Sequence, residues 1–252
     1  MKILASIQAR MNSSRLPGKV LSDICGKPML LWQVERIKRS NYINDIIVAT
    51  SNSREDDTII NFCKDHKINF YRGSENDVLS RISSMLKSYK YDVHVECFGD
   101  SPFIDPKIID EFIIFYFKQK NKDIYISSAL KTTYPPGTEV TLYNPNILIR
   151  TNDLVRSDDK LREHAGYNIS RFPNEFKIHS MEAPQHFNYP DLYLEVDVYE
   201  DLVLIRQIAE YFISKNKNHF SLIEILNYLK KNIDITKKNK FIDRRWKKFR
   251  KI

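Results

Sequence analysis

The sequence lacks several features that would mark a membrane or secreted protein. No hydrophobic run approaches the length of about 20 residues that a membrane-spanning helix requires. The apolar run at residues 1–7 is too short for the core of a signal peptide, and Gln8 and Arg10 follow it at once. Cysteine is scarce, and Cys25, Cys63 and Cys97 form no CxxC pair, which argues against a disulfide framework or a zinc site. We therefore expect a cytoplasmic protein.

Excess charge is also missing from most of the chain, although the formal net charge is +8. Residues 230–252 hold 11 of the 40 Lys and Arg residues but only 2 of the 32 Asp and Glu residues. The first 229 residues therefore carry 29 basic against 30 acidic side chains. Charge gives no support to a nucleic-acid role for the body of the protein, and we expect residues 230–252 to form a basic C-terminal tail.

What the chain does have is a regular alternation of strand and helix patterns. Short apolar runs predict strands at residues 2–7, 45–50, 68–71, 92–98 and 123–128. Helical spacing predicts helices between them, at residues 28–39, 54–66, 77–89 and 106–120. This alternation predicts an α/β fold, in which helices cover both faces of a mainly parallel sheet. Ligands of such sheets bind beyond the carboxyl ends of the strands.

The second half of the sequence is less regular. Strands are predicted at residues 139–143, 176–181 and 192–196, and helices near residue 145 and at 200–214 and 221–231. No internal repeat and no clear linker divides the chain. For a chain of 252 residues we expect a single domain over residues 1–229, with a small arm at about residues 134–189.

A polar loop after the first strand carries the strongest motif, Gln8-Ala9-Arg10-Met11-Asn12-Ser13-Ser14-Arg15-Leu16-Pro17-Gly18-Lys19. It places the cations Arg10, Arg15 and Lys19 beside the hydroxyls of Ser13 and Ser14. Convergent cations and hydroxyls can hold a triphosphate and offset the charge on departing pyrophosphate. The loop is not a Walker A motif, because that motif needs Gly at position 13 and Ser or Thr at position 20. The alternative is a solvated basic loop.

Further motifs follow the loop: Gly26-Lys27-Pro28-Met29-Leu30, Ile46-Ile47-Val48-Ala49-Thr50, Arg72-Gly73-Ser74, Asp77-Val78-Leu79, and Gly99-Asp100-Ser101-Pro102 with Ile104-Asp105-Pro106. Together with the loop they resemble the cytidylyltransferases that make CMP-activated acidic sugars, in particular the branch of spore coat polysaccharide biosynthesis protein F. Acylneuraminate and 3-deoxy-manno-octulosonate cytidylyltransferases are related families. The resemblance covers about the first 110 residues well and the rest in patches.

The resemblance implies a Rossmann-like fold of the nucleotide-diphospho-sugar transferase (GT-A-like) type, with an arm for substrate binding and dimerisation. It also implies a homodimer that uses Mg²⁺ and transfers CMP from CTP to a small acidic acceptor, releasing pyrophosphate, in surface glycan biosynthesis. Arg15 and Lys19 would be catalytic. The nucleotide-binding residues would be Gln8, Ala9, Arg10, Ser13, Ser14, Arg15, Lys19, Arg72, Ser74, Asp77 and Arg81. For Asp77 and Arg81, the alternative is a helix start with an i,i+4 ion pair.

Two aspartates follow predicted strands and are candidate metal ligands. Asp100 comes after the strand at residues 92–98, and Asp197 ends the run at 192–196. Mg²⁺ prefers one or two carboxylates together with substrate phosphates and water, and the resemblance points to the same two residues, with Asp100 also catalytic. Alternatively, Asp100 is a turn residue and Asp197 caps a helix. Glu195 and Asp105 are weaker candidates, and we expect Asp105 to cap the helix that follows it.

Four polar residues in the second half are candidates for an acceptor pocket, namely Glu139, Arg162, Glu163 and His164. Arg162 could grip a carboxylate through two hydrogen bonds, and His164 could relay a proton near neutral pH. The alternative is a solvated helix face with a satisfied histidine.

Some positions depart from the family pattern. Glu96 stands where Arg is common, Phe98 stands where Thr is common, and Ala165-Gly166-Tyr167 replace a sequence like Val-Thr-Pro. These departures leave the CTP half of the pattern intact and keep the acceptor open. It could be a nonulosonic or other sugar acid, a phosphate or a phosphonate.

Two other functions remain open. A glycosyltransferase of similar fold would use a nucleotide-sugar donor, but it would normally show a DxD metal motif, and Gly99-Asp100-Ser101 is not one. A binding protein without catalysis would use the basic runs at residues 237–240 and 244–248 to hold RNA or anionic lipid. For these runs a solvated tail is the alternative, because chain ends often carry like charges.

Overall fold

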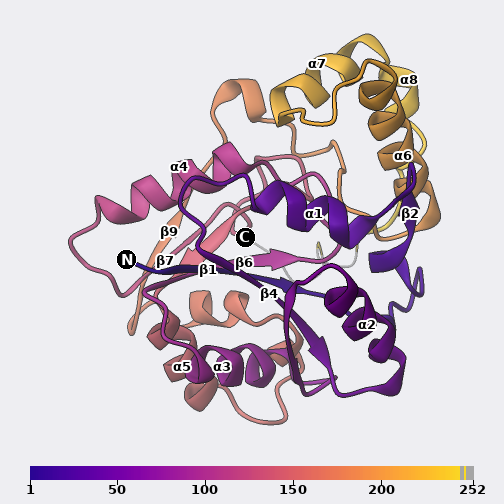
Figure 1. Ribbon diagram of the computed structural model, residues 1–252. Coiled ribbons are helices and arrows are strands. Elements are labelled where there is room, and N and C mark those ends of the chain that lie inside the picture. The colour runs from indigo at the N-terminus through magenta and orange to yellow at the C-terminus, as the bar shows by residue number, and fades with distance from the viewer. Residues whose placement is uncertain (245–246, 248–252) are drawn as a thin grey trace.

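The fold is built on one twisted sheet, seen edge-on in Figure 1. The computed structural model describes residues 1–244 and residue 247. Within them, seven strands pair in the order β5-β4-β1-β6-β8-β7-β9. Their bounds, in that order, are Asn69–Gly73, Asp45–Ser51, Ile3–Gln8, Val93–Phe98, Thr141–Tyr143, Ile124–Ser127 and Lys177–Ser180. β8 runs antiparallel to both of its neighbours and the other pairs are parallel, so the predicted α/β fold with a mainly parallel sheet is confirmed.

Helices cover both faces of this sheet because successive side chains of a strand point to opposite sides. On β1, Ile3, Ala5 and Ile7 face one hydrophobic core, whereas Leu4 faces a second core. The first core takes residues from α1 (Met29–Ile37), α2 (Asp57–Asp65), α4 (Pro106–Phe117), α6 (Tyr199–Ser214) and α7 (Leu222–Lys231). The second takes residues from α3 (Val78–Ser88) and α5 (Pro145–Leu154), which lie below the sheet in Figure 1.

Short elements complete the described chain. They are 3₁₀ turns η1 (Lys19–Leu21), η2 (Arg54–Asp56), η3 (Lys160–Glu163), η4 (Gly166–Arg171) and η5 (Gln185–Phe187), the hairpin of β2 (Asp23–Ile24) with β3 (Lys27–Pro28), and helix α8 (Ile233–Thr236). Asp105 caps α4 as expected, since its side chain accepts a hydrogen bond from the Lys107 N–H at 2.9 Å. In the region predicted as an arm, β8 and β9 join the main sheet.

One predicted strand, at residues 192–196, is wrong. The segment is irregular because its backbone donors bind loops and no neighbouring strand. The Leu194 N–H donates to the Pro136 carbonyl at 2.7 Å, and the Val196 N–H donates to the Asp100 carbonyl at 2.8 Å. The apolar pattern that suggested a strand reflects burial, since Leu194 and Val196 are both completely buried.

The C-terminal segment also differs from the expected solvated tail. Asn239 and Arg244 are buried against the body of the protein, with 1% and 0% of their surface exposed. Residues 245, 246 and 248, which belong to the second basic run, lie outside the described residues. The domain boundary at residue 229 therefore stays a prediction.

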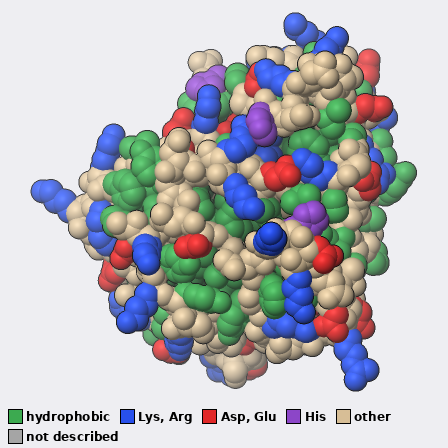
Figure 2. All heavy atoms as spheres, viewed as in Figure 1, with side chains coloured by type: hydrophobic (Ala, Val, Ile, Leu, Met, Phe, Trp, Pro, Cys, Tyr) green, Lys and Arg blue, Asp and Glu red, His purple; other side chains and the backbone are tan. Residues whose placement is uncertain are grey.

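The surface shows no segregation of charge on the face that Figure 2 displays, where Lys and Arg side chains are interspersed with Asp and Glu. None of the helices in the described part of the chain combines the length and apolar character needed to cross a membrane.

Candidate active site

A cavity of about 490 Å³ lies beyond the carboxyl ends of β1 and β6. This is the edge where ligands of parallel sheets bind. Thirteen of the residues predicted for the site line it: Gln8, Ala9, Arg10, Ser13, Ser14, Arg15, Lys19, Arg81, Asp100, Glu139, Glu163, His164 and Asp197. The cavity thus brings together residues that are up to 189 positions apart in the sequence (Gln8 to Asp197).

The polar loop at one side of this cavity is held in shape by hydrogen bonds to its backbone. The Met11 N–H donates to Asp56 Oδ1 at 2.7 Å, and the Met11 carbonyl accepts from the N–H of Ser13 at 2.9 Å and of Gly18 at 2.8 Å. Gly18 has a φ of 72°, a left-handed conformation that glycine adopts without strain. Burial acts to raise the pKa of Asp56, but hydrogen bonds from Met11 and Ser51 outweigh it and lower the pKa, so an ionised carboxylate anchors the loop.

Lys19 lies at the centre of the site and joins both candidate metal ligands. Its Nζ is 3.0 Å from Asp197 Oδ1 and 3.4 Å from Asp100 Oδ2, and it donates to the Val196 carbonyl at 2.8 Å. Burial alone would lower the pKa of Lys19, yet the two carboxylates raise it. Arg15 forms a second ion pair with Asp197. Burial likewise acts to raise the pKa of Asp197, and the charges of Lys19 and Arg15 lower it.

Close backbone packing positions the two aspartates. The Gly99 N–H donates to the Gln8 carbonyl at 2.9 Å, and a Cβ at Gly99 would lie 2.6 Å from that oxygen. Gly137 has a φ of 95°, and a Cβ there would lie 2.3 Å from the Glu195 nitrogen. Because a methyl group fits at neither position, glycine allows the backbone that leads to Asp100 to pack on β1 and the backbone near Asp197 to pack on residue 137.

Two arginines, Arg10 and Arg81, line the cavity and lie close enough for their charges to interact. Arg81 is only 3% exposed, and its Nε has no hydrogen-bond partner within the described chain. Burial and the nearby charge of Arg10 lower the pKa of Arg81 to about 10. A buried cation with an unused donor and a like-charged neighbour would be stabilised by an anion bound between them.

Three residues predicted for nucleotide binding do not line the cavity. Arg72 donates to the carbonyls of Ser51 and Ser53 at 2.9 and 2.7 Å and pairs with Asp57 at 2.7 Å. Ser74 accepts a hydrogen bond from the N–H of Asp77 at 3.1 Å. These contacts fix the turn that leads into α3.

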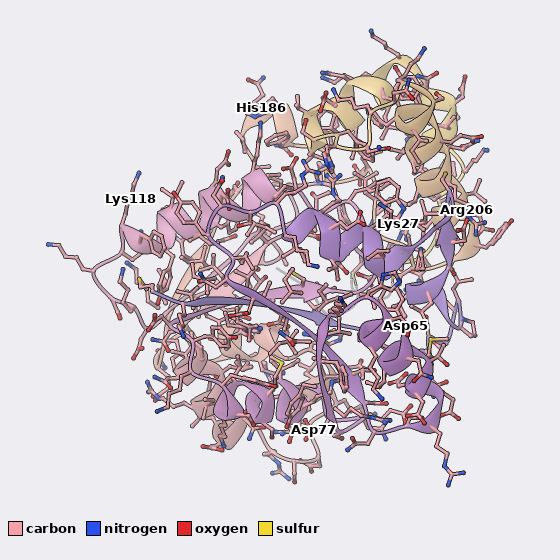
Figure 3. All side chains as sticks on the ribbon, in the orientation of Figure 1. Lys27, Asp65, Asp77, Lys118, His186 and Arg206 are labelled. Atoms are coloured by element: carbon pink, nitrogen blue, oxygen red, sulfur yellow. The ribbon has the colours of Figure 1, made fainter. Side chains whose placement is uncertain are left out.

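Asp77 itself caps that helix. It accepts from the Ser80 N–H at 2.8 Å, and Figure 3 shows it in the layer of α3 and α5. Its other oxygen pairs with Arg162 at 2.8 Å, so the ion pair that the structure shows for Asp77 is made with Arg162 and differs from the i,i+4 pair considered for Arg81.

Arg162, predicted for the acceptor site, does not line the cavity. It is 7% exposed, and besides Asp77 it donates to Asn152 Oδ1 at 2.7 Å and to the Val155 carbonyl at 2.9 Å. These contacts tie η3 to α3 and α5.

Glu96 and Gly166, two of the residues that depart from the family pattern, are in contact. Glu96 is 1% exposed and accepts hydrogen bonds from Gln8 Nε2 at 2.6 Å, from the Tyr143 hydroxyl at 2.7 Å and from the Gly166 N–H at 3.2 Å. A Cβ at Gly166 would lie 2.1 Å from Glu96 Oε2. Burial raises the pKa of Glu96 in spite of these bonds. The choice of Glu at one position thus requires the smallest residue at the other.

Sequence reasoning missed several residues of the site. Tyr125, Thr141 and Tyr167 also line the cavity, together with Glu195, which was only a weak candidate. Strand alternation could have found Tyr125, because it shares a sheet face with the buried Tyr143. No local signal marks Tyr167, which lies on a 3₁₀ turn.

The donor set suits a hard divalent cation. Asp100 and Asp197 both reach one ammonium group, so their carboxylates already converge on a single positive charge. Among the described residues, no cluster of three or more His, Cys, Asp or Glu side chains could hold a metal by itself. Two carboxylates completed by substrate phosphates and water form a magnesium site of the usual kind. The residues present therefore fit Mg²⁺ in the presence of a nucleotide.

The sequence is similar to known proteins over most of its length. Residues 4–243 match the family described as cytidylyltransferase. The spore coat polysaccharide biosynthesis protein SpsF of Bacillus subtilis (strain 168) is 32% identical over 236 residues, which cover 92% of this chain and 95% of that protein. The 3-deoxy-manno-octulosonate cytidylyltransferase of Saccharophagus degradans is 38% identical over 112 residues, 44% of each chain.

A solved structure extends the similarity to nearly the whole fold. The cytidylyltransferase from Leptospira borgpetersenii serovar Hardjo-bovis superposes with a TM-score of 0.87 at 27% identity, covering 97% of this chain and 100% of that one. The Rossmann-like nucleotidyltransferase fold expected from the sequence is confirmed.

Proposed function

The chain belongs to the cytidylyltransferase family and is a CTP-dependent nucleotidyltransferase, and from this premise we propose that it transfers CMP to a small sugar acid with Mg²⁺ as cofactor. The observation that carries the proposal is the convergence of Arg15, Lys19, Asp100 and Asp197 in one cavity at the carboxyl edge of the sheet. The relative that acts on 3-deoxy-manno-octulosonate supports an acidic sugar as acceptor.

The nucleotide half of the cavity would hold the triphosphate. Four cations line it, namely Arg10, Arg15, Lys19 and Arg81, which come from the loop after β1, from the start of η1 and from α3. A nucleoside triphosphate carries about four negative charges, and each contact with a cation near a protein surface contributes about 4 kcal/mol at 4 Å. Ser13 and Ser14 lie on the same loop and would add hydrogen bonds. This half therefore matches a triphosphate in charge.

Asp100 and Asp197 would hold the magnesium ion. When bound, the ion would neutralise phosphate charge and favour departure of pyrophosphate. The ammonium of Lys19 keeps the Asp197 carboxylate ionised and available as a ligand, as the lowered pKa of Asp197 indicates.

The acceptor half has the opposite character. Among the lining residues outside the nucleotide half are three carboxylates, Glu139, Glu163 and Glu195, and none is Lys or Arg. A doubly charged phosphate or phosphonate would be repelled there, whereas sugar hydroxyls can donate hydrogen bonds to carboxylates. Of the acceptors left open by the sequence, the lining favours one that presents hydroxyl groups, with its single carboxylate toward the cations.

The reaction that we propose is one displacement at phosphorus. The acceptor hydroxyl oxygen attacks the α-phosphorus of CTP, the bond from that phosphorus to the bridging oxygen breaks, and pyrophosphate leaves with the electron pair. Arg15 and Lys19 stabilise the charge on the departing group. The hydroxyl proton passes to a base in the acceptor half, for which the structure offers His164, whose Nε2 lies 3.4 Å from Glu163 Oε1. The rate of this displacement then depends mainly on how the two reactants are positioned and on how the charge of the transition state is stabilised.

Release of pyrophosphate tests the proposal directly. The protein is incubated with CTP, Mg²⁺ and a panel of sugar acids, phosphates and phosphonates, and we expect turnover with at least one sugar acid and slower or no turnover with the phosphates and phosphonates. The matched control is Asp100→Asn, which keeps the size of the side chain and removes its charge. Turnover confined to phosphate acceptors would contradict the acceptor class. Absence of turnover with every acceptor would contradict the reaction.

Thermal stabilisation of the protein by its ligand distinguishes a cytidylyltransferase from a glycosyltransferase. CTP at about 100 times its dissociation constant adds about 2.7 kcal/mol to the free energy of unfolding. For a chain of this size this raises the Tm by about 5–11 °C. A UDP-sugar should add much less. The reverse order would indicate a nucleotide-sugar donor. The homodimer stays a prediction, which the mass of the protein in solution tests.

A further inference from the structure

The basic C-terminal segment packs against the body of the protein through the buried side chain of Arg244. Arg244 is completely buried and is among the largest buried side chains of the described chain. Its guanidinium makes a two-pronged ion pair with Asp201, with NH1–Oδ2 and NH2–Oδ1 distances of 2.8 and 2.7 Å. It also lies over the ring of Tyr193 at 4.3 Å, and 3.6 Å from Glu195 Oε1. Such a forked pair fixes both partners in orientation.

Asn239 strengthens the same junction. Its Nδ2 donates to Asp201 Oδ1 at 2.8 Å and to the Tyr193 carbonyl at 3.0 Å, and its own carbonyl accepts from Arg244 at 3.2 Å. Two residues of the C-terminal segment therefore hold one buried carboxylate of the body, at the first turn of α6.

That carboxylate in turn holds the loop of a candidate metal ligand. Asp201 Oδ2 accepts from the backbone N–H of Asp197 at 2.9 Å and of Val198 at 3.1 Å. Asp197 carries the carboxylate that Lys19 and Arg15 bind. A continuous path of hydrogen bonds thus leads from Arg244 through Asp201 to the backbone of Asp197.

The segment also contacts the polar loop after β1. Arg15 NH1 donates to the Asp243 carbonyl at 3.1 Å, while its NH2 pairs with Asp197. Both members of this ion pair are therefore held by the C-terminal segment, Arg15 directly and Asp197 through Asp201.

We propose that residues 239–244 form part of the active site, and that Arg244 is a positioning residue which, through Asp201, holds Asp197 in place for the metal and the nucleotide. The proposal rests on the function proposed above. It assigns to the segment a role in the reaction, in place of binding RNA or lipid, and it predicts that truncation after residue 232 destroys activity.

The test compares Arg244→Met with Arg36→Met in the full chain. Arg36 is equally buried, at 2% exposed, and donates from Nε to the Ile104 carbonyl at 2.8 Å, outside the cavity lining. For Arg244→Met we expect kcat to fall by about 10–100-fold, and the Mg²⁺ concentration that gives half-maximal activity to rise by about 10–100-fold. Arg244→Lys should restore only part of the loss, because an ammonium cannot make the forked pair. Arg36→Met should change Tm without these effects.

Hydrogen exchange gives a readout that does not depend on turnover. Exchange of the Asp197 and Val198 amides should speed up at least about tenfold in Arg244→Met and stay unchanged in Arg36→Met. Folded Arg244→Met with wild-type kcat, wild-type Mg²⁺ dependence and wild-type exchange at these amides would overturn the proposal. If Arg244→Met does not fold, Arg244→Lys and Asn239→Ala are judged by the same criteria. A wild-type protein without cytidylyl transfer refutes the proposed function, whereas an active wild type with equally active variants refutes only the role of Arg244.

Discussion

Replacing Lys19 by Met tests the centre of the site, because one ammonium group there contacts two carboxylates and a carbonyl. Removing one member of a fully buried ion pair costs about 3–5 kcal/mol. The cost here should be smaller, since Arg15 still pairs with Asp197 and the Asp100 side chain keeps 29% of its surface exposed. We expect a loss of about 1–2 kcal/mol, a fall in Tm of about 2–8 °C.

The kinetic effect of Lys19→Met should be larger than the effect on stability. A fixed donor that faces developing charge is worth about 10²–10³ in kcat. Steady-state pyrophosphate release with saturating CTP measures the loss, and circular dichroism confirms the fold. If kcat of the folded variant stays within a factor of three of the wild type, Lys19 does not act on the departing group.

The pH dependence of stability checks the same cluster. Lys19 and Arg15 lower the pKa of Asp197 against the effect of burial, so this carboxylate contributes stability above the ordinary Asp pKa of about 3.9, and the contribution is lost as pH falls through the lowered value. The raised pKa of Lys19 contributes stability below 10.5, which is lost as pH rises through the folded value. The stability difference between wild type and Lys19→Met should therefore be greatest at intermediate pH and should narrow in acid. Urea unfolding at several pH values would show a constant difference if the charges did not interact.

Three further substitutions separate the site from its surroundings. Asp100→Asn should lower turnover by at least about 10²-fold with Tm nearly unchanged, and an active variant would remove Asp100 from the metal site. Gly166→Ala should destabilise the fold by about 1–3 kcal/mol in urea unfolding, because the added methyl group would meet Glu96; equal stability would show that the buried carboxyl can move. Arg162→Met should lower stability by about 1–3 kcal/mol through loss of its pair with Asp77, while the acceptor KM stays within twofold; a large rise in that KM would return Arg162 to the acceptor site.

The convergence of the main charged residues was accessible from the sequence. Asp100 and Asp197 each follow a buried apolar run, Lys19 lies on the segment that follows β1, and in a mainly parallel sheet the ends of such runs meet at one edge. Asp197 reaches this edge although residues 192–196 are not a strand, because the buried side chains of Leu194 and Val196 anchor the segment in the core.

Partners far apart in sequence could not be predicted in this way. Arg162 looked like a residue of the acceptor site, but Asp77, 85 positions earlier, takes its guanidinium. Arg244 stands in a run of basic residues, and the average charge of that run predicts a solvated surface. Only the three-dimensional packing shows that this one arginine leaves the solvent to pair with Asp201.

A crystal structure with CTP and Mg²⁺ would show directly where nucleotide and metal bind. We expect a triphosphate against Arg15 and Lys19, with the metal ion bound by Asp100 and Asp197. Nucleotide bound outside this cavity, or a metal ion that contacts neither aspartate, would contradict it.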